Sequence, residues 1–108
     1  MPLAVLLRQP DGALVGGLIG ETVWQWLWLR LLWVDPGHRG AGHGRDLLAA
    51  AEAEAVRRGC HHARLDTFSF QAAGFYERCG YRQVLCLDDF PAGHQRLFYV
   101  KSLTRPSP

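Results

Sequence analysis

The chain has 108 residues, of which 48% are hydrophobic and 20% charged, so it predicts one globular domain and excludes a disordered chain. The formal net charge of +2 is too small for a dedicated nucleic-acid binder, which would carry a clustered basic face. The three cysteines form no CxxC pair, and no apolar run is long enough to span a membrane. We therefore expect a cytoplasmic protein with no metal, no nucleic-acid partner and no membrane partner.

Three strands are predicted in the first third of the chain, at residues 3–8, 13–23 and 26–35. Pro10 and Gly12 supply a turn between the first two. Glycines at positions 16, 17 and 20 of the second strand indicate a bulge or close packing against a neighbour. The third strand is apolar on both alternating faces except at Arg30, which is typical of a central strand covered on both sides.

A short basic turn rich in glycine follows the third strand. It consists of Arg39, Gly40, Ala41, Gly42, His43 and Gly44. Because these side chains are mostly small, successive backbone N–H groups can point into one hollow, and the next helix adds its own unpaired N–H groups. The turn therefore predicts a phosphate or pyrophosphate site. No Lys follows the glycines, which excludes a P-loop, and GxGxxG fails at Arg45 or Leu47.

The second half of the chain alternates helices and strands. A helix is predicted at residues 45–58, with an apolar stripe at Leu47, Leu48, Ala51 and Ala55, Glu54 facing Arg58 and Gly59 just past its end. Further elements are a strand at 63–68, a helix at 70–79 capped by Ser69, strands at 82–87 and 96–103, and a frayed tail at 104–108. This order predicts an α/β (α+β) domain.

Two motifs carry a resemblance to a known family. The pattern R-x-x-G-x-G at Arg39, Gly42 and Gly44 resembles motif A of the GNAT acetyltransferase superfamily. The segment 69–81 resembles the family's later motif N-x-x-A-x-x-[LF]-Y-x-[KR]-x-G-[FY], with Ser69 in place of Asn and agreement at Ala72, Phe75, Tyr76, Arg78, Gly80 and Tyr81. The resemblance implies one GNAT-like domain over residues 1–108, with a mixed, largely antiparallel twisted sheet of about six strands and two main helices.

The resemblance also implies a shortened amino terminus. GNAT domains normally begin with a strand and one or two helices before the hairpin with which this sequence starts. Those helices usually cover one face of the sheet, so we expect open apolar surface and a homodimer. The tryptophans Trp24, Trp26 and Trp28 share one face if their strand is unbroken. They could form an aromatic wall for an acceptor, although packing in a core or a subunit interface is the favoured interpretation.

By resemblance, the function is direct transfer of acetyl from acetyl-CoA to a primary amine on a small molecule or peptide. The family pattern assigns cofactor binding to Leu32, Trp33 and Val34, to all six turn residues with Arg45, and to Ser69. The N–H of Val34 would stabilise the thioester oxygen. Tyr76 would protonate the departing thiolate, although an aromatic on a helix is more often a core residue.

The general base stays open at this point. The position that often carries Glu in the family corresponds to about Trp28, which cannot accept a proton. Glu21, Asp66, a histidine or a chain of waters are the substitutes. The alternative function is a catalytically inactive CoA-binding module, or a dimeric regulatory or interaction protein.

Overall fold

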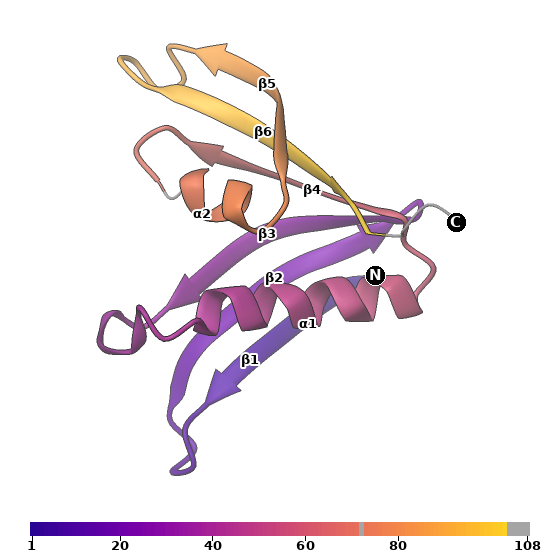
Figure 1. Ribbon diagram of the computed structural model, residues 1–108, viewed down its shortest axis with the longest axis vertical. Helices are drawn as coiled ribbons and strands as arrows, with labels where there is room; N and C mark the ends of the chain where they lie inside the picture. Colours follow the sequence, from indigo (N-terminus) through magenta and orange to yellow (C-terminus); the bar gives the residue numbers. More distant parts are fainter. Residues whose placement is uncertain (72, 104–108) are drawn as a thin grey trace.

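The computed structural model describes residues 1–71 and 73–103, and the predicted frayed tail lies outside the described residues. It contains one mixed six-stranded sheet in the order β1-β2-β3-β4-β6-β5 and two α-helices, which confirms the predicted fold class (Figure 1). The elements are β1 Pro2–Arg8, β2 Leu14–Val23, β3 Trp26–Val34, the short 3-10 helix η1 Pro36–His38, α1 His43–Arg57, β4 His62–Phe68, α2 Ala73–Arg78, β5 Arg82–Asp88 and β6 Gln95–Ser102.

Strands β1 to β3 form an antiparallel meander that α1 covers on one face. The predicted stripe of α1 is confirmed, because Leu47, Leu48, Ala51 and Ala55 are all buried. The expected glycine bulge is confirmed as well. The register of β2 and β3 shifts beside Gly20, where an added Cβ would lie 2.5 Å from the carbonyl oxygen of Trp28. The meander and α1 therefore make one closely packed unit.

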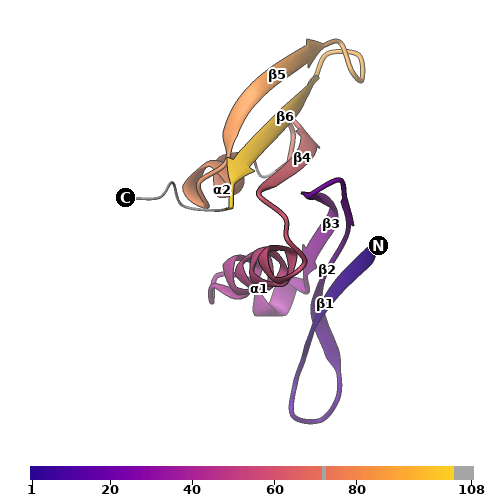
Figure 2. The same ribbon diagram turned by 90° about the vertical axis from the view of Figure 1, so that its right-hand side faces the viewer.

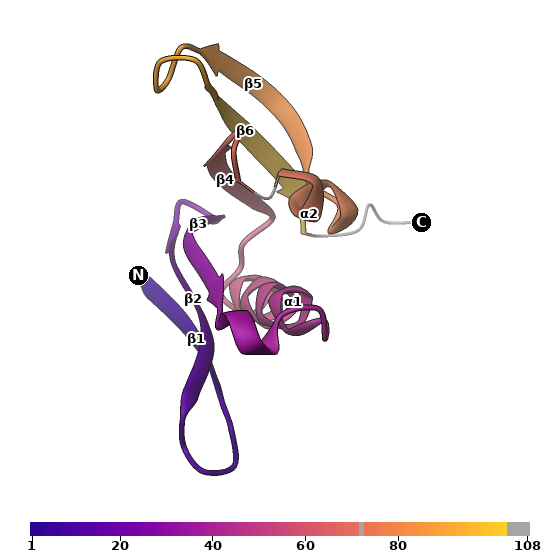
Figure 3. The same cartoon turned by 90° about the vertical axis from the view of Figure 1, so that its left-hand side faces the viewer.

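The sheet divides between β3 and β4. These strands are parallel and pair only at Trp26 with His62, Leu27 with Ala63 and Trp28 with Arg64, after which they part. We call β1–β3 with α1 (residues 2–57) the first wing, and β4–β6 with α2 (residues 62–102) the second wing. Figures 2 and 3 show that α1 and α2 lie on the same side of the sheet.

Within residues 1–71 and 73–103, no helix covers the opposite face of the first wing, which we call the bare face (Figures 2 and 3). Leu6, Ile19 and Leu31 are all exposed there, which confirms the expected open apolar surface. The prediction that β3 is covered on both sides is therefore wrong. Both helices lie on the same side of the sheet, so the β3 side chains on the other side, such as Leu31, stay exposed.

The condition under which the three tryptophans would share one face is not met, since β2 ends at Val23 and β3 begins at Trp26. Trp24 does not belong to a strand, because it lies in the β2–β3 turn with φ of 49° and is 93% exposed. Trp26 stacks on His62 with ring centroids 4.6 Å apart. Trp28 lies between the guanidinium groups of Arg30 and Arg64, at 4.5 and 4.3 Å from its ring centroid. These contacts bridge the short paired segment of the two wings.

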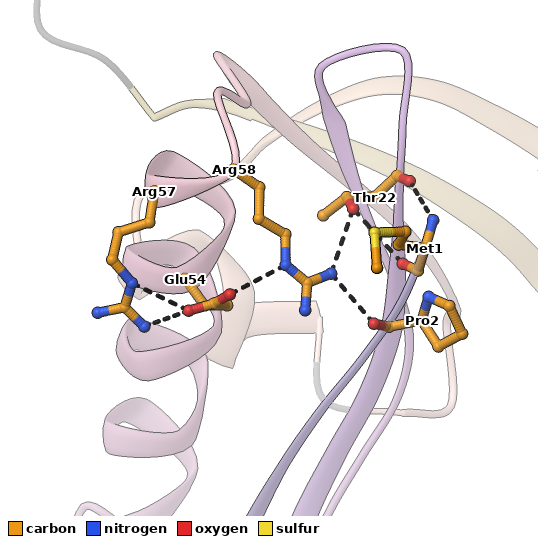
Figure 4. A network of polar contacts seen from close by, with 6 residues as sticks. All are labelled: Met1, Pro2, Thr22, Glu54, Arg57 and Arg58. Carbon is orange, nitrogen blue, oxygen red and sulfur yellow. Dashed lines mark hydrogen bonds and ion pairs between the residues drawn. The ribbon is translucent and has the colours of Figure 1, made fainter.

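A polar network fastens the end of α1 to the strands of the first wing (Figure 4). Glu54 accepts hydrogen bonds from Arg57 and Arg58, which confirms the predicted pairing with Arg58 and lowers the pKa of the Glu54 carboxyl. Arg58 also donates to the Pro2 carbonyl at 3.0 Å and to the Thr22 hydroxyl at 3.3 Å.

Within the described residues, no helix is both long and apolar enough to cross a membrane.

Candidate active site

A cleft of about 960 Å³ opens where β3 and β4 part. Its walls are the second half of β3, the glycine turn, the start of α1, the end of β4 and one side of α2. Parallel strands that separate leave backbone groups without ladder partners, so a ligand can bind between them. The two wings therefore meet around one long cavity.

The glycine turn lies at one end of this cleft. Gly40 and Gly42 both have φ of 84°, a left-handed conformation that glycine adopts without the steric cost of a Cβ. Helix α1 begins directly after Gly42, and the N–H of Asp46 donates to the Gly42 carbonyl at 3.1 Å. The N–H groups of the preceding helical residues have no carbonyl one turn earlier, so they are available to an anion.

The edge of β3 supplies further backbone groups. The N–H of Asp35 donates to the Val15 carbonyl, and the register pairs Gly16 with Val34. Because hydrogen-bonded and non-bonded pairs alternate in an antiparallel ladder, the N–H and carbonyl of Val34 point away from β2 and toward the open cleft. Arg39 Nε donates to that carbonyl at 3.0 Å.

The charges along the cleft are unevenly distributed. Arg39, Arg45 and Arg78 all line the cleft, and Arg39 and Arg45 flank the glycine turn. Asp66 on β4 is the one carboxylate among the described residues that line the cleft. The cations beside the turn favour an anionic ligand there, and Asp66, which is paired with Arg96, is the acidic group on the opposing strand.

Tyr76 lies on α2 and lines the same cleft. Burial raises the pKa of its phenol, and the neighbouring Cys79 thiol adds to the increase. The ring packs edge-on against Phe75 and Tyr81, with centroids 5.2 and 6.1 Å away. The phenol therefore keeps its proton at neutral pH, as a general acid must.

The two wings touch across the turn. A Cβ added to Gly44 at the start of α1 would lie 3.3 Å from Phe75 Cζ on α2. Gly44 thus allows the helices of the two wings to pack closely beside the glycine turn.

Comparison with known proteins decides the family. A family model described as "Acetyltransferase (GNAT) family" matches residues 2–81. The chain belongs to the GNAT acetyltransferase family. It is 50% identical to blasticidin-S acetyltransferase of Streptomyces morookaense over 93 residues, which are 85% of this chain and 68% of that protein. This GNAT chain is thus related to acetyl-transferring enzymes.

Solved structures agree with that assignment. An acetyltransferase from Bacillus cereus superposes with a TM-score of 0.90 at 35% identity, covering 94% of this chain and 73% of that one. An aminoglycoside 6'-N-acetyltransferase complexed with coenzyme A has a TM-score of 0.87 at 18% identity and shares the fold, covering 99% of this chain and 76% of that one.

The GNAT chain places most of the residues assigned to the cofactor along the cleft. Leu32, Trp33, Val34, Arg39, Gly40, Gly42, His43, Gly44 and Arg45 line it, whereas Ala41 and Ser69 do not. The prediction that Ser69 caps a helix beginning at residue 70 is wrong. Helix α2 is described from Ala73, and Ser69 Oγ instead accepts a hydrogen bond from the Gln95 N–H at 2.9 Å. Tertiary contact with β6 therefore replaces the local cap.

Glu21 and Asp66 occupy different places in the GNAT domain. Glu21 Oε1 lies 3.6 Å from Arg30 Nη1, and Glu21 is not among the residues that line the cleft. Asp66 Oδ1 accepts from Arg96 Nε and Nη2 at 2.9 and 2.7 Å. The Arg96 contact could not be predicted from the sequence, because it joins residues 30 positions apart and depends on the register of β4 with β6.

Across the described part of the chain, no three histidine, cysteine or acidic side chains gather as a metal would require. Cys60, Cys79 and Cys86 are free thiols.

Proposed function

We propose that the protein is an N-acetyltransferase that transfers acetyl from acetyl-CoA to a primary amine by direct attack. The observation that carries this proposal is that the glycine turn and Tyr76 line one cleft from opposite wings. Membership of an acetyltransferase family and a shared fold with a coenzyme A complex support the choice of cofactor. The turn residues that line the cleft, from Arg39 to Arg45, would bind the pyrophosphate, whereas Ala41 and Ser69 do not line the cleft and have no part in this proposal.

The proposed reaction follows from the arrangement of these groups. The amine nitrogen attacks the thioester carbonyl carbon, and the Val34 N–H stabilises the negative charge that develops on the carbonyl oxygen. The C–S bond then breaks, and the Tyr76 hydroxyl gives its proton to the sulfur. The amine loses a proton to a base, the Tyr76 phenolate regains a proton from that base or from solvent, and the products are the acetylated amine and free coenzyme A.

Two carboxylates remain candidates for the base or for holding the amine. Glu21 lies on the bare face beside Arg30, and Asp66 lies in the cleft wall beside Arg96. We expect Asp66→Asn to lower kcat/KM for the amine by roughly 100-fold, because removal of a general base costs that much or more. Glu21→Gln serves as the paired variant. A larger loss in Glu21→Gln would assign the proton transfer to Glu21.

The acceptor is proposed to be a small-molecule amine. The related blasticidin-S acetyltransferase is named for such a substrate, and the carboxylate of Asp66 suits a cationic amine. A peptide amine is the second class to test. The compartment is proposed to be the cytoplasm, where coenzyme A and free thiols are both stable.

A thiol-release assay over a panel of small-molecule and peptide amines tests the proposal. The wild type should release coenzyme A with at least one amine, and Tyr76→Phe should lower kcat by roughly 100-fold or more, since the leaving sulfur loses its proton donor. Calorimetric titration with acetyl-CoA is run beside it. Binding without release on any amine would instead identify a CoA-binding module, and absence of binding would indicate an interaction protein.

We also propose a homodimer formed through the bare face of the first wing. Leu6, Ile19 and Leu31 are exposed together with Trp24. Exposed apolar side chains in such number favour an interface. Sedimentation should show a dimer at micromolar concentration, and Leu31→Glu should shift it toward monomer. A wild-type monomer at that concentration would contradict the proposal.

A further inference from the structure

An ionic contact joins the two wings behind the cleft. Glu52 lies on α1 in the first wing, and Lys101 lies on β6 in the second. Lys101 Nζ is 2.9 Å from Glu52 Oε1, and the two side chains are 26% and 15% exposed. The Tyr81 hydroxyl donates to Glu52 Oε2 at 2.8 Å. Both oxygens of the Glu52 carboxylate therefore bind groups of the opposite wing.

The same lysine also holds the end of α2. Lys101 Nζ donates a second hydrogen bond, of 2.8 Å, to the carbonyl of Cys79, which directly follows the helix. Carbonyls at a helix C-terminus carry partial negative charge and lack partners within the helix, so an ammonium group stabilises them. A six-residue helix has little stability of its own, and its position depends on such contacts.

Local backbone geometry leaves room for this lysine. Gly80 has φ of 95°, and a Cβ added there would lie 3.3 Å from Lys101 Cε. The chain reverses at Gly80, and the N–H of Tyr81 donates back to the Tyr76 carbonyl at 3.0 Å. The segment from Tyr76 to Tyr81 is thus tied to itself and, through Lys101 and Glu52, to α1.

The contact lies directly behind the cleft. A smaller cavity of about 250 Å³ is bordered by Glu52 and Lys101, and it shares Arg45, Arg78 and Cys79 with the walls of the cleft. Few backbone pairs join the wings, since β3 and β4 pair at only three positions. A shift of α2 relative to α1 would therefore change the distance between Tyr76 and the glycine turn.

We propose that Glu52 and Lys101 form a strut that sets the spacing of the two wings and thereby positions Tyr76 over the thioester sulfur. The proposal rests on the function proposed above. Glu52 and Lys101 act through Tyr76 as positioning residues and do not touch the reacting atoms.

The kinetic test combines strut variants with Tyr76→Phe. Glu52→Gln and Lys101→Met should each lower kcat by roughly 10- to 100-fold, the cost of displacing a catalytic group by about 1 Å. In the Tyr76→Phe background the same changes should have less than about threefold effect on kcat, because the group that they position is gone. Equal losses in both backgrounds would overturn the proposal.

Glu54→Gln is the matched control. Glu54 lies on the same helix, two residues further along the chain. Its partners Arg57 and Arg58 lie at the C-terminal end of that helix, so the substitution removes a carboxylate that does not contact the second wing. It should leave kcat unchanged. A single strut variant leaves one charge without its partner and could fail to fold for that reason. In that case the double variant Glu52→Gln with Lys101→Met, which removes both charges, is assayed in place of the single variant.

Hydrogen exchange separates this proposal from the proposed function. Glu52→Gln should speed amide exchange in residues 73–81 and leave residues 43–57 unchanged, with or without any acetyl transfer. Faster exchange in an enzyme that acetylates nothing would support the strut and contradict the function. Unchanged exchange in residues 73–81 would overturn the strut even if the enzyme is active.

Discussion

The two wings differ in how they are built. In the first wing, a 15-residue helix covers three antiparallel strands and buries an apolar stripe against them. In the second wing, a six-residue helix packs mainly against β5, an edge strand whose residues are mostly exposed. The first wing contributes backbone N–H groups to the cleft, whereas the second contributes the side chains of Tyr76 and Asp66. Backbone donors need a rigid support, and side chains can be held by a few specific contacts.

Removing buried volume from the first wing should have the largest effect. Leu48 is 2% exposed, so Leu48→Ala should lower the free energy of unfolding by about 2–5 kcal/mol through lost burial and the resulting cavity. Urea titration measures the change. Leu85→Ala is the control in the second wing, where the side chain is 49% exposed, and it should cost less than about 1 kcal/mol. Similar losses in both variants would end the contrast between the wings.

Alkaline pH should weaken the second wing next. Burial, followed by the charge of Glu52, raises the pKa of Tyr81 far above its ordinary value, and burial raises that of Tyr76. The unfolded chain loses these protons near pH 10 while the folded protein keeps them. The free energy of unfolding should therefore be unaffected by these tyrosines at neutral pH and fall above pH 10, by up to about 1.4 kcal/mol per pH unit for Tyr81, with a further decline from Tyr76.

Chemical denaturation at a series of pH values between 8 and 11 measures this decline. Three phenols have a raised pKa, those of Tyr76, Tyr81 and Tyr99. Tyr81→Phe removes one of them and should make the decline shallower, whereas a Tyr81→Phe slope equal to that of the wild type would show that Tyr81 titrates normally in the folded state.

A backbone change in the glycine turn should have the smallest effect on stability and a specific effect on binding. Gly42→Ala places a Cβ at φ of 84° and should cost about 1–2 kcal/mol of stability. It should also weaken acetyl-CoA binding roughly tenfold, because the added Cβ distorts the N–H donors of the turn. A tenfold rise in Kd corresponds to about 1.4 kcal/mol of binding free energy. Calorimetry measures the affinity.

Gly12→Ala is the matched control for that change. Gly12 has φ of 90° in the β1–β2 turn, far from the cleft, with no atom within 4 Å of an added Cβ. It should lose similar stability and keep the affinity of the wild type. A loss of affinity in both variants would mean that general destabilisation, and not the turn, weakens binding.

Several features of the site could be read from the sequence because they are local. The glycine turn, the apolar stripe of α1 and the pairing of Glu54 with Arg58 depend on residues a few positions apart, and the structure has each of them. The role of Ser69 as a helix cap was predicted wrongly, since β6 binds its hydroxyl. A tertiary hydrogen bond replaces the local preference of serine for a cap.

The order of the elements, the glycine turn and the family could be predicted before any coordinates were known, because hydrophobic period, glycine placement and motif spacing all act over short stretches of chain. Three other features depend on the folded arrangement of the whole chain: the point where β3 and β4 part, the exposed apolar face of the first wing, and the side chains that meet across the wings. The contacts of Glu52 with Lys101 and of Asp66 with Arg96 join residues 49 and 30 positions apart. Their distance depends on strand order and register, which no local pattern encodes.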